Sequence, residues 1–179
     1  MKLVMPRILR RFRRNEDGSA IMLEFVIFVP LLFSTLLMST ELGLYAVRHM
    51  FLERGLDIAV RHVRLNTGNP PTHDEVKDMI CEYAGFLDDC EETLRLEMVA
   101  IDPRAFSKMP AVADCVDTSL TIQPVRGYTL GQQQELMMMR ACVKFDPIYP
   151  TTGLGRAMAK DGSGKVTMIS AAAFVQEPG

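Results

Sequence analysis

Residues 19–47 read SAIMLEFVIFVPLLFSTLLMSTELGLYAV, and Glu24 and Glu41 are the only charged side chains in this stretch. Residues 25–40 carry no charge at all. A helix that crosses a bilayer needs about 20 mainly apolar residues, and the flanking residues extend the uncharged centre past that length. The sequence therefore predicts a transmembrane helix at 19–47.

Charge is distributed unevenly along the chain, whose 179 residues allow one compact domain plus an accessory element. Six basic side chains fall within the first 14 residues, whereas from Gly18 onward 14 basic side chains face 20 acidic ones, a net charge of −6. The positive-inside rule then places the N-terminus in the cytoplasm and the rest of the chain outside it. An acidic body also argues against binding of nucleic acid.

A cleaved secretory signal is the alternative interpretation of a basic start followed by an apolar segment. The apolar run is longer than the usual signal core, no Ala-x-Ala site closes it, and a carboxylate lies near its start. These features favour a retained membrane helix.

Two residues inside the apolar stretch call for an explanation. A carboxylate such as Glu24 costs about 2.5–3.5 kcal/mol at the centre of a membrane helix. Pro30 frees a backbone carbonyl that neighbours must satisfy, which suggests packing against other helices. An interfacial carboxylate that reaches the lipid headgroups explains Glu41 at the other end, and remains an alternative for Glu24.

The stretch RRNEDGSAIMLEF at 13–25, followed by VPLL at 29–32 and ELG at 41–43, resembles the class 3 signal and N-terminal helix of type IV pilin-like proteins. The resemblance is specifically to the TadE/TadF-like minor pilins, or pseudopilins, of the tight-adherence (Tad or Flp) pilus system. It runs along most of the chain, is specific at the N-terminus, and is loose between Thr72 and Arg126.

The resemblance implies cleavage by a prepilin peptidase at Gly18, Ser19 and Ala20. Glu24 would be the sixth residue of the mature chain if cleavage follows Gly18, and the fifth if it follows Ser19. It further implies that Glu24, Phe25 and Pro30 act in assembly and registry, where the Glu24 carboxylate neutralises a new terminal amine in a medium of low dielectric constant.

The implied partners are the prepilin peptidase, other minor pilins and the major pilin through the N-terminal helix, the inner-membrane assembly platform, and membrane lipid. The expected location is the bacterial inner membrane, with a single pass and a periplasmic C-terminal domain, or the extracellular pilus itself. Whether the chain is TadE-like or TadF-like stays open.

Beyond residue 47 the patterns predict an α+β, pilin-like domain. Apolar residues at helical spacing extend the first helix as a stalk over 48–65, and the breaker NTGNPP ends it. Thr72 and Glu75 form a capping box that starts a second helix ending by Asp89, with an apolar stripe. Its members are Val76, Ile80, Tyr83, Ala84 and Leu87.

Period-two patterns then predict four strands of an antiparallel sheet. The segments are 93–101, 119–123, 137–145 and 166–175. We therefore divide the chain into a cytoplasmic leader (1–18), a transmembrane helix (19–47), a stalk (48–65) and an outer α+β domain (66–179).

Four cysteines lie on the side predicted to be outside the cytoplasm, where disulfides persist. Three pairings are possible, and the most local joins Cys81 to Cys90 and Cys115 to Cys142. Metal binding is the rival use, but the chain has no Cys-x-x-Cys pair and its histidines are not at ligand spacing.

Little in the sequence predicts catalysis. The stretch GSGK at 162–165 lacks the first glycine and the Ser/Thr of a phosphate loop, so a hairpin turn is the simpler interpretation. The methionines at 137–139 are better explained as core or contact residues than as copper ligands. We expect a noncatalytic minor pilin without a cofactor, required for pilus assembly and surface attachment. The alternatives are an unprocessed single-span envelope protein with a binding or scaffolding domain, and a membrane-anchored enzyme.

Overall fold

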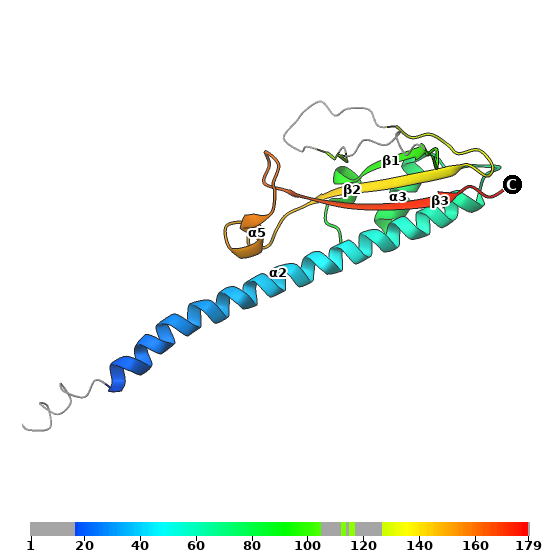
Figure 1. Cartoon of the computed structure of the whole chain (residues 1–179). Coiled ribbons are helices and arrows are strands. Elements are labelled where there is room, and N and C mark those ends of the chain that lie inside the picture. The colour runs from blue at the N-terminus through cyan, green and yellow to red at the C-terminus, as the bar shows by residue number, and fades with distance from the viewer. Residues whose placement is uncertain (1–16, 105–111, 114, 117–126, 179) are drawn as a thin grey trace, which may run out of the picture. The chain divides into compact units, whose positions relative to one another are not determined.

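The computed structural model describes residues 17–104, 112–113, 115–116 and 127–178, with only the backbone for residues 17–20. Contacts divide the chain into two compact units, Met1–Thr40 and Glu41–Gly179. The architecture is α+β, as predicted, and its elements are drawn in Figure 1. Their order is α2 (Asp17–Leu65), α3 (His73–Tyr83), α4 (Cys90–Thr93), β1 (Arg95–Ala100), β2 (Leu136–Phe145), α5 (Gly153–Ala157) and β3 (Val166–Val175).

The first helix, α2, ends at Leu65, where the sequence predicts its end. The last carbonyl groups of a helix lack partners within it, and here the Asn66 side chain donates to the carbonyl of His62 at 2.8 Å. Residues from the other end of the chain supply further donors, since the Gln176 side chain bonds the Val63 carbonyl at 2.8 Å and the Glu177 amide bonds the Arg64 carbonyl at 3.3 Å. The C-terminal segment thus caps α2.

Helix α3 begins with the predicted capping box. The Thr72 hydroxyl accepts from the Glu75 amide at 3.4 Å, and the Thr72 amide donates to the Glu75 carboxylate at 2.8 Å. The hydrogen bond from the Thr72 backbone lowers the pKa of Glu75. Val76 and Ile80 are buried as predicted, but Tyr83 is 41% exposed and does not belong to the apolar stripe.

The described part of the sheet contains three antiparallel strands in the order β1-β2-β3. Glu97 of β1 faces Arg140 of β2, and Cys142 of β2 faces Ile169 of β3. The strand predicted at 119–123 lies outside the described residues. The short helices α4 and α5 were not predicted, because four or five residues are too few to show a helical period.

The hydrophobic core lies on one face of this sheet, beneath α3 and the part of α2 that follows Glu41. Alternate residues of β2 point into it, which explains why Met137 and Met139 are fully buried. The methionine cluster therefore supplies core residues, as the alternating pattern predicts. Large buried members of the core are Leu52, Leu56 and Val63 of α2, Val76 and Ile80 of α3, Leu96 and Met98 of β1, and Met168 and Phe174 of β3.

Gly55 lets α2 and α3 approach closely. A Cβ at this position would lie 2.6 Å from the carbonyl oxygen of Ile80, which is backbone and cannot move aside cheaply. Ala84, also buried, provides the matching small residue on the α3 side. Residues 48–65, predicted as a stalk, are thus packed against the outer domain by their apolar face.

Candidate functional site

The N-terminal part of α2 carries the residues that the sequence assigns to processing and assembly. The helix from Ile21 onward is long and apolar enough to cross a membrane. Hydroxyl groups in this part bond the carbonyl three residues earlier, as Ser34 does to Leu31 at 2.9 Å and Thr35 does to Leu32 at 2.8 Å. Such bonds satisfy polar side chains without water, which makes them tolerable in lipid.

Glu24 and its neighbours present their side chains to the surroundings. Glu24 is exposed, and Leu23 and Phe25 are 66% and 67% exposed. Large apolar side chains this exposed require lipid or another protein around them. The helix continues through Pro30 without a break.

The three residues assigned to cleavage, Gly18, Ser19 and Ala20, lie in the first turn of α2. Cleavage after Gly18 or after Ser19 would therefore remove almost none of the helix. Their side chains lie outside the described part of the structure.

Glu41 has a role that the sequence did not predict. Glu41 is only 4% exposed. Its two carboxylate oxygens accept hydrogen bonds from the backbone amides of Ile148 at 3.0 Å and Tyr149 at 2.9 Å. The interpretation of Glu41 as a carboxylate that reaches lipid headgroups is therefore wrong. Bonds from two consecutive amides to one carboxylate fix the position of the β2–β3 connection against α2.

That connection is folded tightly. At Gly155 in α5, a Cβ would lie 2.4 Å from the carbonyl oxygen of Tyr149, so only glycine fits there. The connection is also held near its start, because the Arg48 guanidinium donates to the Asp146 carbonyl at 3.2 Å and lies 5.2 Å from the centre of the Phe145 ring.

Both disulfides of the most local pairing are present in the structure. Cys81 bonds to Cys90 and links α3 to α4, and Cys115 bonds to Cys142 of β2. No free cysteine remains. The second disulfide holds Cys115 on the face of the sheet opposite the core.

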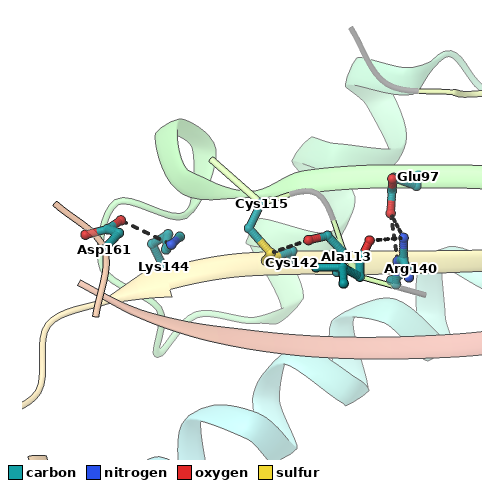
Figure 2. The surroundings of a disulfide bond; sticks show 8 residues. Glu97, Ala113, Cys115, Arg140, Cys142, Lys144 and Asp161 are labelled. Atoms are coloured by element: carbon teal, nitrogen blue, oxygen red, sulfur yellow. Dashed lines mark hydrogen bonds and ion pairs between the residues drawn. A yellow bond between two sulfur atoms is a disulfide. The ribbon is translucent and has the colours of Figure 1, made fainter. Parts of the chain in front are cut away.

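Figure 2 shows that Cys142 is the middle residue of a row of cross-links along β2. Arg140, Cys142 and Lys144 share the face opposite the core, and each is joined to a different segment. Arg140 pairs with Glu97 of β1 at 2.6 Å, and Lys144 pairs with Asp161 at 3.1 Å. The side chains of both ion pairs are 11% exposed or less. We call this set the cross-link row.

Asp161 organises the turn that precedes β3. One of its carboxylate oxygens accepts the amides of Ser163 and Lys165, both at 3.0 Å, and the Ser163 hydroxyl at 2.7 Å. The stretch at 162–165 is therefore a turn, as expected. Burial disfavours the charged form of Asp161, but the bonds from Ser163, Lys144 and Lys165 outweigh it and lower the pKa.

Replacing Asp161 with asparagine should flatten the acid dependence of stability. Because the folded pKa lies below its usual value of 3.8, the carboxylate stabilises the fold above that pH and loses this effect as pH falls through the folded value. Asp161→Asn should lower the free energy of unfolding by about 2 kcal/mol at neutral pH. Denaturant unfolding of the full chain in detergent, followed by circular dichroism between pH 7 and pH 3, measures the difference.

Asp146→Asn is the matched control for this experiment, because Asp146 also pairs with a lysine, Lys165 at 3.3 Å, but its side chain is 71% exposed. It should change stability little at any pH. An Asp161→Asn variant that loses stability in acid as steeply as the unmodified chain would contradict the assignment.

The other polar residues considered in the sequence serve the fold as well. His49 lies 3.2 Å from the carbonyl of Ile169, and His73 lies 2.9 Å from the Asp74 carboxylate. Lys165 pairs with Asp89 and Asp146. Within the described ranges, no three His, Cys, Asp or Glu residues gather as a metal site would require.

An open groove of about 520 Å³ lies between α2 and α3. Its wall carries cationic residues from α2 and acidic residues from α3, including Arg61, Glu75 and Glu82. The volume falls in the range of ligand pockets. Apolar side chains line the groove as well, among them Ile58, Leu65 and Met79.

Comparisons of this chain with models of known families, with curated proteins and with solved structures give no match. The class of this protein therefore rests on the architecture of the described residues. The chain has one N-terminal helix long and apolar enough to span a membrane, followed by an α+β unit with a three-stranded antiparallel sheet and two disulfides.

Proposed function

We propose that this chain is a noncatalytic minor pilin of the TadE/TadF type, cleaved by a prepilin peptidase and required for assembly of a Tad-type pilus. The observation that carries the proposal is α2, one helix from Asp17 to Leu65 that begins at the proposed cleavage residues and ends in the outer domain. A pilin needs such a helix, because it anchors the subunit in the membrane before assembly and packs with other helices in the filament.

The surface of α2 supports a role in helix association. Apolar residues before Glu41 are exposed, and Glu24 is an exposed carboxylate among them. Cleavage would create a cationic amine four or five residues before Glu24, a little more than one helical turn away. An amine of the same chain or of a neighbouring subunit then provides a counter-charge in low dielectric, where ion pairs are strong.

The outer unit fits a structural role. Its buried ion pairs and both disulfides join segments of the chain to one another. A subunit that leaves a membrane for a filament needs such cross-links, because it experiences two environments. We assign the outer unit to the periplasmic side, where disulfides form.

The N-terminus of the mature protein tests this function directly. Intact-mass spectrometry of protein from cells with a prepilin peptidase should find a chain that starts at Ser19 or Ala20. Cells without the peptidase should contain the full-length chain. A chain that begins at Met1 in both strains would contradict the proposal.

A pair of glycine variants sharpens the test. Gly18→Leu should block cleavage, because this class of peptidase requires a small residue there. Gly43→Leu is the control on the same helix, since a Cβ at Gly43 meets nothing within 4 Å. It should leave cleavage unchanged.

The second candidate is an unprocessed single-span envelope protein whose outer domain binds a ligand or scaffolds a complex. The groove between α2 and α3 is the observation in its favour. An intact N-terminus in both strains is the result that would select it.

A further inference from the structure

The connection between β2 and β3 is fixed to α2 at the residue where the uncharged stretch ends. Ile21–Thr40, in which Glu24 is the only charged residue, comprises 20 residues, or about 30 Å of helix at 1.5 Å per residue, which matches the hydrocarbon thickness of a bilayer. Glu41 is the next residue, and it holds the amides of Ile148 and Tyr149. If α2 spans a bilayer, these amides lie at the boundary between hydrocarbon and headgroups.

The composition of this connection differs from that of the unit that carries it. The connection between β2 and β3, residues 146–165, contains three basic and two acidic side chains. Its middle part, residues 147–160, contains Arg156 and Lys160 and no acidic side chain, and the Lys160 ammonium donates to the Pro150 carbonyl at 2.6 Å. From Glu41 to the end, in contrast, the chain has 14 basic and 19 acidic side chains, a net charge of −5. The basic excess therefore lies in the segment bonded to Glu41.

Three side chains of the connection have the character of residues at a membrane interface. Ile148 is 44% exposed, Tyr149 is half-buried and Arg156 is exposed. Aromatic rings with a polar end concentrate at the headgroup level, and apolar side chains beside basic ones bind there by burial and by attraction to anionic lipid.

We propose that residues 147–160, which we call the interfacial loop, rest on the outer surface of the bilayer and bind anionic phospholipid headgroups. Ile148 enters the acyl boundary and Arg156 pairs with phosphate. The acidic remainder of the unit is repelled by the same surface, so the loop sets the orientation of the unit above the membrane. This proposal requires α2 to span a bilayer, but it requires neither cleavage nor a pilus.

Tryptophan fluorescence tests the contact, because the chain contains no native tryptophan. Ile148→Trp and Thr151→Trp place reporters on the loop at exposed positions. Val175→Trp is the matched control, at a residue that is 51% exposed next to the capped end of α2. The full-length chain is reconstituted into vesicles whose phosphatidylcholine is brominated near the top of its acyl chains, with and without about 30% phosphatidylglycerol.

Brominated lipid should lower the emission of both loop reporters about twofold, as expected for side chains that lie within the interfacial layer. It should leave the reporter at residue 175 nearly unchanged. Two loop reporters are used so that one poorly folded variant does not decide the outcome. Loop reporters quenched no more than the control would overturn the contact with the bilayer.

Binding of anionic headgroups is tested separately, by comparing quenching in neutral and in anionic vesicles. Quenching of the loop reporters should be stronger with phosphatidylglycerol present, and Arg156→Glu should remove that difference. Equal quenching in neutral and anionic vesicles, unaffected by Arg156→Glu, would overturn recognition of anionic lipid. The N-terminus of the mature chain does not enter this measurement, so its outcome is independent of the pilin assignment.

Discussion

Replacing Glu24 with alanine is expected to prevent pilus assembly while leaving the protein in the membrane. In the proposed filament the Glu24 carboxylate pairs with a terminal amine, and two unit charges about 4 Å apart interact with about 4 kcal/mol at an effective dielectric constant of 20. Each 1.4 kcal/mol is a tenfold change in an association constant. Pili counted by electron microscopy should therefore fall about tenfold or more.

Membrane insertion should not suffer from the same change, because removing a charge from an apolar segment makes insertion easier. Cell fractionation and detection of the cleaved chain measure this. Glu24→Gln should behave like alanine, since the charge and not the shape is required, whereas Glu24→Asp should retain part of the function. Normal pilus numbers in Glu24→Ala would count against the assigned role.

Glu53→Ala provides the control on the same helix. Glu53 is also an acidic residue of α2, but its side chain is 55% exposed and lies 3.3 Å from His49 within the outer unit. It follows the apolar stretch and cannot reach a terminal amine at the start of α2. Pilus number should be unchanged, so a loss of pili in both variants would point to a general defect.

The sequence correctly predicts the features that depend on residues close together along the chain. Both ends of the long helix depend on local signals, an apolar run and the breaker after Leu65. The capping box at Thr72 needs only the residue three positions later. The strands at 137–145 and 166–175 follow from alternation, which a sheet with one face on the core imposes.

Features that join distant segments escape the sequence, because no local pattern encodes them. The amides that bind Glu41 are 107 and 108 residues further along the chain. The apolar residues before Glu41 favoured its interpretation as a contact with lipid headgroups. Its partners are instead backbone amides, which any residue could supply. The position of Glu24 among exposed apolar residues follows from sequence, whereas its partner in an assembly does not.

The cross-link row was predictable from local sequence only in part. Arg140 and Lys144 stand two residues on either side of Cys142, so a strand places all three on one face. That spacing could have predicted a polar face with partners. The identity of the partners could not be predicted, since Glu97 is 43 residues away and Asp161 comes from the turn before β3.

Breaking the Glu97–Arg140 pair should destabilise the outer unit strongly. Glu97 accepts from the Arg140 Nε at 2.7 Å and faces it directly across the two strands, and both residues are 8% exposed. Glu97→Leu removes a carboxylate that is bonded to a buried guanidinium, and removing one partner of a buried ion pair costs about 3–5 kcal/mol. Against a total stability of about 5–15 kcal/mol for a domain, the midpoint of denaturant unfolding should fall sharply.

The double variant Glu97→Leu with Arg140→Met separates two contributions to stability. One is the attraction within the ion pair, and the other is the cost of burying Arg140 without Glu97. Because it removes both charges of the pair, it should recover most of the stability lost in Glu97→Leu. The exposed pair of Arg64 and Glu177, with side chains 42% and 47% exposed, is the control, and Glu177→Gln should cost less than about 1 kcal/mol. If the double variant is as unstable as Glu97→Leu alone, the loss of stability comes from the missing attraction and geometry of the pair, and not from leaving Arg140 buried without Glu97.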